Sequence, residues 1–161
     1  MIFRVDGPRG DVLPVTLSDV VGAVTSTHPS LQWFLGEFYG AGYTGVLYPG
    51  NRTYEDFTND LASTRSLLTA EELSSVASAT FDIYDVFLVG IRVGESVARY
   101  VGHNPVERFQ TFASQHAVVA ECVDSGFWRI SIQDDRLAKK TVDLLAAIPG
   151  VVISEFSLPK V

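Results

Sequence analysis

The stretch YGAGYTGVLYPGN, residues 39–51, contains glycines at the spacing G-x-G-x-x-G: Gly40, Gly42 and Gly45. In dinucleotide-binding proteins this spacing follows a strand and opens a helix, whose amide groups bind the pyrophosphate. Here the preceding residues, SLQWFLGEFY, have helical periodicity, and the Pro-Gly pair of YPG follows too closely for a helix to begin. The stretch therefore does not predict a nucleotide site. We interpret Gly40 as the end of a helix and the other glycines as turn residues.

Titratable residues that could form an active site or a metal site are few and widely spaced. The three histidines do not have the spacing of a zinc site. Asp82 and Asp85 flank the start of a predicted strand and could act as acid and base or bind Mg²⁺, but their offset places them on opposite faces of extended chain. One alternative stays open, a small enzyme or ligand-binding domain whose site is assembled from distant residues, namely Asp82, Asp85, His103 and His116.

Other chemistries lack their usual signals. Cys122 is the single cysteine, so it forms no internal disulfide and no thiolate metal site, and its apolar strand context is typical of an inert buried thiol. No G-x-S-x-G motif for a serine nucleophile occurs. The basic residues Arg136, Lys139 and Lys140 alternate with acids instead of forming a stripe for nucleic acid. We therefore predict no cofactor, no metal, no nucleic acid and no catalytic residue.

Negative charge is concentrated in the middle of the chain. The formal net charge is −7, and residues 54–95 carry eight acids against two arginines. Such a field repels phosphate backbones and anionic lipid and attracts a basic partner. A solvated helix surface would explain the same acids without a partner. Among them, we predict that five steer a partner: Glu55, Asp56, Asp60, Glu71 and Glu72.

Aromatic residues are concentrated just before this acidic region and at its beginning. Eight of the eighteen aromatics lie between residues 33 and 57. Four of them fall on no inner helical stripe, Trp33, Tyr39, Tyr43 and Tyr48, although core packing is the ordinary role of any single ring. Because Tyr and Trp often anchor protein interfaces, we predict that Trp33, Tyr43 and Tyr48 contact a partner.

The periodicity predicts one α+β domain over residues 1–161, a mostly antiparallel sheet with helices packed on it and a C-terminal hairpin, helix and strand. Strands are predicted at 2–5, 12–15, 43–48, 84–93, 116–123, 127–132 and 151–156. Helices are predicted after Thr16, over 30–39, and after Thr53, Thr69, Asn104 and Asp134 or Asp135. VARYV, residues 97–101, fits either a strand or a short helix.

These observations predict a non-enzymatic protein-binding module. No apolar run approaches the roughly 18–20 residues of a membrane span, and the N-terminus lacks the pattern of a secretion signal. A single cysteine is typical of a reducing cytoplasm, here most simply bacterial. The most concrete hypothesis is an acidic immunity-type inhibitor that binds and neutralises a basic bacterial toxin domain, without contacting a membrane. An adaptor subunit of a larger assembly fits the same composition, and the sequence predicts no particular oligomeric state.

Overall fold

The computed structural model describes residues 1–8 and 13–157, and these residues form a single sheet of seven strands. The strand order is β3-β2-β4-β5-β6-β1-β7, and every neighbouring pair is antiparallel. The strands are β1 (Ile2–Asp6), β2 (Gln32–Gly42), β3 (Leu67–Leu68), β4 (Thr80–Ile91), β5 (Val118–Val123), β6 (Phe127–Ile132) and β7 (Val152–Glu155). The predicted α+β class with an antiparallel sheet is confirmed, as is the β5–β6 hairpin.

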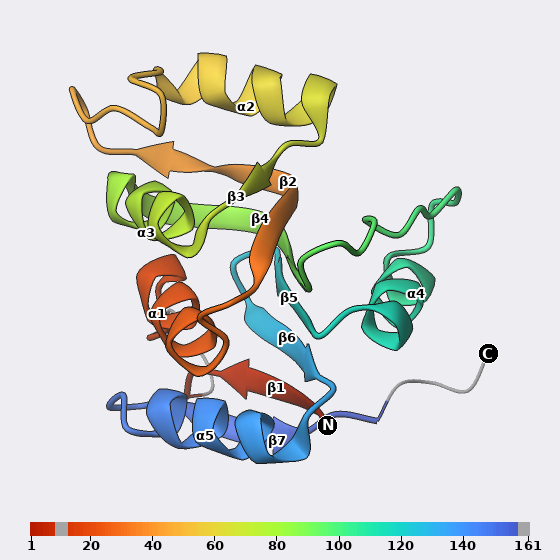
Figure 1. Cartoon of the computed structure of the whole chain (residues 1–161). Helices are drawn as coiled ribbons and strands as arrows, with labels where there is room; N and C mark the ends of the chain where they lie inside the picture. The colour runs from red at the N-terminus through yellow and green to blue at the C-terminus, as the bar shows by residue number, and fades with distance from the viewer. Residues whose placement is uncertain (9–12, 158–161) are drawn as a thin grey trace.

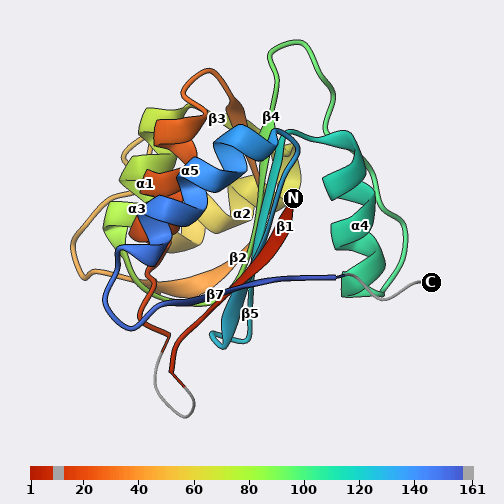
Figure 2. The same ribbon diagram turned by 90° about the horizontal axis from the view of Figure 1, so that it is seen from below.

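Helices cover both faces of this sheet unequally. The helices in the described residues are α1 (Leu17–Thr27), α2 (Tyr54–Thr64), α3 (Ala70–Ala79), α4 (Pro105–Gln115) and α5 (Asp135–Ala146). In Figures 1 and 2, α1, α2, α3 and α5 lie on one face of the sheet and α4 lies on the other. Each side of the sheet therefore has its own apolar core, a large one under α1, α3 and α5 and a smaller one under α4.

The helices begin where the capping signals place them. Thr16 and Asp19 form a reciprocal capping box at α1, and Thr69 and Glu72 form one at α3. Asn104 and Asp134 accept backbone N–H groups at the starts of α4 and α5. Local side-chain hydrogen bonds thus explain why these helix starts were predictable from sequence.

Residues 32–42 are the main correction, because they form β2 and not a helix. β2 lies inside the sheet, with Trp33 and Leu35 in the larger core and Phe34 in the smaller one. A strand covered on both faces buries consecutive residues, so its apolar pattern is not alternating and resembles that of a helix. Gly40 is therefore a strand residue and not a helix end.

The glycine fingerprint has a structural explanation in β2 and the turn that follows. A Cβ atom at Gly40 would lie 2.4 Å from the carbonyl oxygen of Asp82, and one at Gly42 would lie 2.7 Å from the Tyr48 hydroxyl. Gly45 has a φ of 78°, in the left-handed region that favours glycine. The spacing therefore serves close backbone packing and a turn, and no helix follows it.

Three smaller predictions also differ from the structure. Residues 43–48 form a turn instead of an extended segment, and residues 97–101 form neither strand nor helix. In the predicted strand 12–15, Val12 lies outside the described residues, and residues 13–15 are not a strand. Residues 84–91 of the predicted strand 84–93 do belong to a central strand, but β4 begins earlier, at Thr80, directly after α3, and ends at Ile91.

A chain of ion pairs fastens α4 to the sheet. The Arg108 guanidinium of α4 donates to Glu121 of β5 at 2.7 Å and pairs with Glu37 of β2 at 2.9 Å. Glu121 also accepts from Arg129 of β6, and these two side chains are only 4% and 5% exposed. Both arginines lie over phenylalanine rings, Phe87 and Phe109, and the Glu121–Arg129 pair is enclosed, whereas Arg108 remains partly exposed.

Candidate protein-binding surface

Exposed large hydrophobic side chains gather at one end of the β2–β4 ladder. In the described part of the chain eleven such residues are exposed, and six of them lie in the segments 39–47 and 81–84. These segments meet because β2 and β4 pair antiparallel, with Tyr39 opposite Asp85 and Gly42 opposite Thr80. We call this area the ladder-end surface, and its hydrophobic members are Tyr39, Tyr43, Val46, Leu47, Phe81 and Tyr84.

The rings of this surface form two contacting pairs. The centroids of Tyr43 and Phe81 are 5.3 Å apart, and those of Tyr39 and Tyr84 are 5.1 Å apart. The first pair lies on the face that carries α1 and α3. Tyr39 follows Phe38, which packs against the larger core, so alternation along β2 directs Tyr39 to the opposite face. The surface therefore wraps around the end of the ladder.

Two of the three predicted aromatic anchors are wrong. Trp33 is 0% exposed and Tyr48 is 2% exposed, so neither is available to a partner. Trp33 points into the larger core because β2 is a strand. The Tyr48 ring stacks on Phe57 at 5.1 Å, and its hydroxyl is 3.0 Å from that of Thr80.

Tyr43 is 53% exposed and stays a candidate contact residue. Phe81 and Tyr84 are absent from the predicted contact residues, and both are exposed. Alternation in FDIYDVF places Tyr84 on the opposite face from the buried Ile83, and this was the signal that could have revealed Tyr84. Phe81 shares the face of Ile83, so no local pattern indicates that its ring is exposed.

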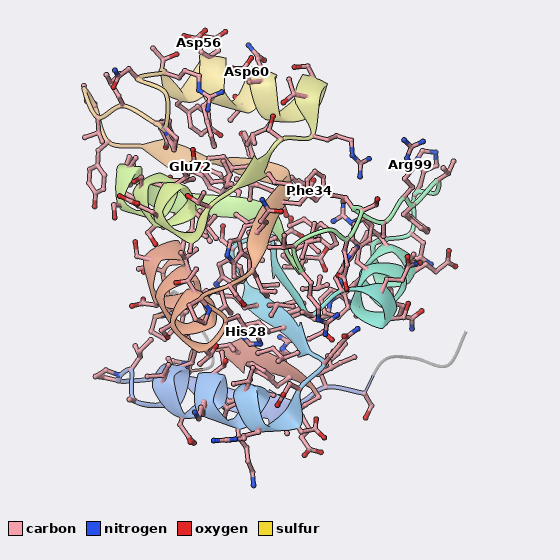
Figure 3. The ribbon with its side chains drawn as sticks, viewed as in Figure 1. His28, Phe34, Asp56, Asp60, Glu72 and Arg99 are labelled. Carbon is pink, nitrogen blue, oxygen red and sulfur yellow. The ribbon has the colours of Figure 1, made fainter. Side chains whose placement is uncertain are left out.

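The five predicted acids are all exposed but do not form one patch. Figure 3 shows Asp56 and Asp60 on the outer helix α2 and Glu72 on α3. A shallow groove is lined by both the 43–48 turn and the start of α2, which brings Glu55 and Asp56 beside the ladder-end surface. Glu71 and Glu72 lie at the far end of α3 from Phe81, about 15 Å away at the rise of an α-helix.

Several of these carboxylates already have local partners. Asp60 pairs with Arg52 at 2.6 Å. Asp56 accepts from the Thr53 hydroxyl, and Glu72 accepts the N–H of Thr69 in the capping box. Glu55 forms no ion pair with any residue that the structure describes. Glu71 likewise lacks one within residues 1–8 and 13–157. The field of the α2 acids is therefore only partly compensated.

The alternative active site is not assembled. His116 lies just before Val118, which pairs with Gly90 of β4. Gly90 is about 25 Å along that strand from Asp82, at a rise of about 3.3 Å per residue. His116 and Asp82 are therefore far apart. The His116 ring is buried and accepts the N–H of Ala98 at 2.9 Å. Asp85 accepts the N–H of Asp124. His103 is exposed. Among the described residues, no group of three or more His, Cys, Asp or Glu is close enough to hold a metal ion.

A pocket of about 350 Å³ adjoins the ladder-end surface, and we call it the α1–β4 pocket. It lies between the first turn of α1, the last turn of α3 and the start of β4. Its floor consists of the buried residues Val15, Leu17, Ala77, Ile83 and Cys122, and its rim carries Tyr43, Phe81 and Asp82. Burial raises the pKa of the Cys122 thiol to about 12, which leaves it uncharged and poorly nucleophilic.

Two buried histidines predict how stability depends on pH. Burial lowers the pKa of His28 and of His116 below the ordinary value of 6.5. Below pH 6.5 the unfolded chain therefore binds more protons than the folded protein, and the free energy of unfolding falls as the pH falls. We expect a slope of at most about 1.4 kcal/mol per pH unit for each histidine. Urea unfolding between pH 7.5 and 5.5 measures it.

Matched variants separate this effect from other titrations. His28→Gln and His116→Gln should each flatten the slope, because each removes one buried imidazole. Figure 3 places His28 in the interior near α1 and α5. A slope that survives in both buried-site variants would disprove the assignment to these rings.

Comparison with family models, with curated proteins and with solved structures finds no match to this chain. Within residues 1–8 and 13–157, none of the helices has the length and apolar character required to cross a membrane. The function is therefore inferred from the surface of the molecule.

Proposed function

We propose that this chain is a non-enzymatic protein-binding module. Its most concrete form is an acidic immunity-type inhibitor, which acts in the bacterial cytoplasm and neutralises a toxin domain with a basic surface. The observation that carries the proposal is the gathering of exposed rings and aliphatic side chains at the ladder end, beside carboxylates of α2 and β4. Contiguous exposed hydrophobic surface is typical of an interaction site.

Charge and hydrophobic contact have separate roles in this proposal. Glu55 and Asp60 lie on exposed α2, and Asp82 lies at the start of β4, so a basic partner is attracted toward this side of the molecule. Tyr43 and Phe81 then supply area that is removed from water on contact. An inhibitor bound in this way neutralises a toxin by covering its active cleft or its substrate path.

Purification of the chain from its native cells, with identification of the protein that accompanies it, tests the function directly. We expect a basic protein that is lethal when expressed alone and harmless when this chain is present. Recovery of the chain only as a self-assembly, or with a partner that is harmless alone, would contradict the inhibitor and indicate an adaptor.

Charge reversal tests the steering role. Glu55→Lys with Asp60→Lys leaves the capping contact of Asp56 intact, and we expect association with the captured partner to slow about tenfold or more at low ionic strength. The difference should shrink as salt screens the field. Stopped-flow association rates measure it.

The control variant makes the same change in net charge elsewhere. Asp143→Lys with Glu155→Lys reverses two exposed acids on α5 and β7 and should alter the rate much less. Equal slowing in both variants, or none in either, would refute steering by α2.

A further inference from the structure

The α1–β4 pocket has a floor that suits an apolar group. Leu17 of α1, Ala77 of α3 and Ile83 of β4 converge there, each less than 10% exposed. Its volume of about 350 Å³ is at the lower end for ligand pockets, which commonly measure about 300–1,000 Å³. This is room for one side chain or a similarly small group.

Two hydroxyl groups of the pocket lining are engaged within the protein. Thr80 donates to the carbonyl of Val76 at 2.8 Å, and Ser125 donates to the carbonyl of Ile83 at 2.7 Å. A polar ligand therefore gains few new hydrogen bonds from these two groups, and at the apolar floor the source of affinity is apolar contact.

An anionic ligand is disfavoured at the same place. The first turn of α1 lines the pocket, but its capping box already occupies two amide groups there. The Asp19 carboxylate accepts the N–H of Thr16, and the Thr16 hydroxyl accepts the N–H of Asp19. Asp82 adds a second negative charge at the rim. In the lining, so far as the structure describes it, Asp82 is the one charged side chain and no Lys, Arg or His is present.

The rim suits a cation. The Asp82 carboxylate accepts the N–H of Ile83 at 2.9 Å and makes no ion pair with the described residues. The exposed rings of Tyr43 and Phe81 lie on the same rim, with centroids 5.3 Å apart. Aromatic faces attract ammonium and guanidinium groups, and so does an unpaired carboxylate.

We propose that the α1–β4 pocket binds an apolar side chain of a partner polypeptide, and that Asp82 binds a lysine or arginine next to it in the partner sequence. The inference rests on the proposed protein-binding function and specifies the partner's contact chemistry. The apolar side chain fills the floor, and the neighbouring basic side chain lies along Tyr43 and Phe81 to reach Asp82.

Short capped peptides test the pocket without the partner. The probes are acetyl-leucyl-arginine amide, acetyl-alanyl-arginine amide and acetyl-leucyl-glutamate amide, titrated at millimolar concentrations into the ¹⁵N-labelled chain. We expect saturable amide shifts at Ser18, Asp82 and Ser125 with the first peptide. Loss of the leucine methyl groups should weaken binding about tenfold or more, and the glutamate peptide should not bind.

Variants assign the two contacts. Ala77→Leu fills the floor from α3 and should abolish binding. Asp82→Asn keeps the acceptor for the N–H of Ile83 and should weaken binding of the arginine peptide about two- to fivefold. Asp60→Asn, on α2 and away from the pocket, is the matched control and should have no effect. The Asp82 and Asp60 variants change exposed side chains, so the test survives if Ala77→Leu does not fold.

The outcomes also distinguish this inference from the proposed function. The pocket assignment would be overturned by absent shifts at the pocket, by equal binding of the glutamate peptide, or by equal effects of Asp82→Asn and Asp60→Asn. The protein-binding function would then still be tested by the capture and charge-reversal experiments. If those experiments fail while the peptides bind as expected, the pocket is a peptide site and the inhibitor proposal falls.

Discussion

Replacing Glu121 by alanine is expected to lower the free energy of unfolding by about 3–5 kcal/mol, because it leaves buried arginine charge without its carboxylate. Glu121 accepts from both Arg108 and Arg129, and the Arg129 side chain is 5% exposed. These bonds join α4 to β5 and β6, so their loss should also loosen α4. Urea unfolding followed by circular dichroism measures the change.

The exposed Arg52–Asp60 pair provides the control. Asp60→Ala removes an ion pair of similar length in solvent, and the expected cost is below about 1 kcal/mol. A Glu121→Ala variant that is as stable as Asp60→Ala would show that the buried network does not hold α4 to the sheet.

Replacing Trp33 by alanine is expected to cost about 3–5 kcal/mol of stability, since the ring is 0% exposed and its removal leaves a cavity in the larger core. Tyr43→Ala changes a half-exposed ring, and its effect on stability should stay within about 0.5 kcal/mol. Calorimetric or denaturant unfolding of the two variants measures the contrast.

Partner binding should show the reverse order. Tyr43→Ala should weaken the complex by about 2 kcal/mol or more if this ring is an anchor, whereas Trp33→Ala should leave the affinity of the folded fraction unchanged. Weaker binding by Trp33→Ala with native stability would mean that the ring is accessible, contrary to its position in β2.

Signals contained in short segments predicted a large part of the fold. Thr16 with Asp19 and Thr69 with Glu72 marked helix starts, because a capping box is made by residues three apart in sequence. The β5–β6 hairpin was also predictable locally, because its two strands and the turn between them are consecutive in the sequence. Composition and these elements together were enough for the α+β class.

The position of β2 was not predictable locally. Its burial pattern depends on α4, which follows it by more than sixty residues in the chain and covers the second face of the sheet (Figure 2). Local periodicity cannot distinguish a strand covered on both faces from a helix. The error at β2 also displaced Trp33, which the helical pattern left outside the core.

The sequence alone determines the net charge, the acidic middle of the chain and the many aromatic residues. The expectation of a basic partner follows from these features. Which rings are exposed depends on the long-range register of β2 with β4, because only that pairing brings Tyr43 to Phe81 and Tyr39 to Tyr84. The candidate site is therefore a product of strand pairing between distant segments, which no local pattern encodes.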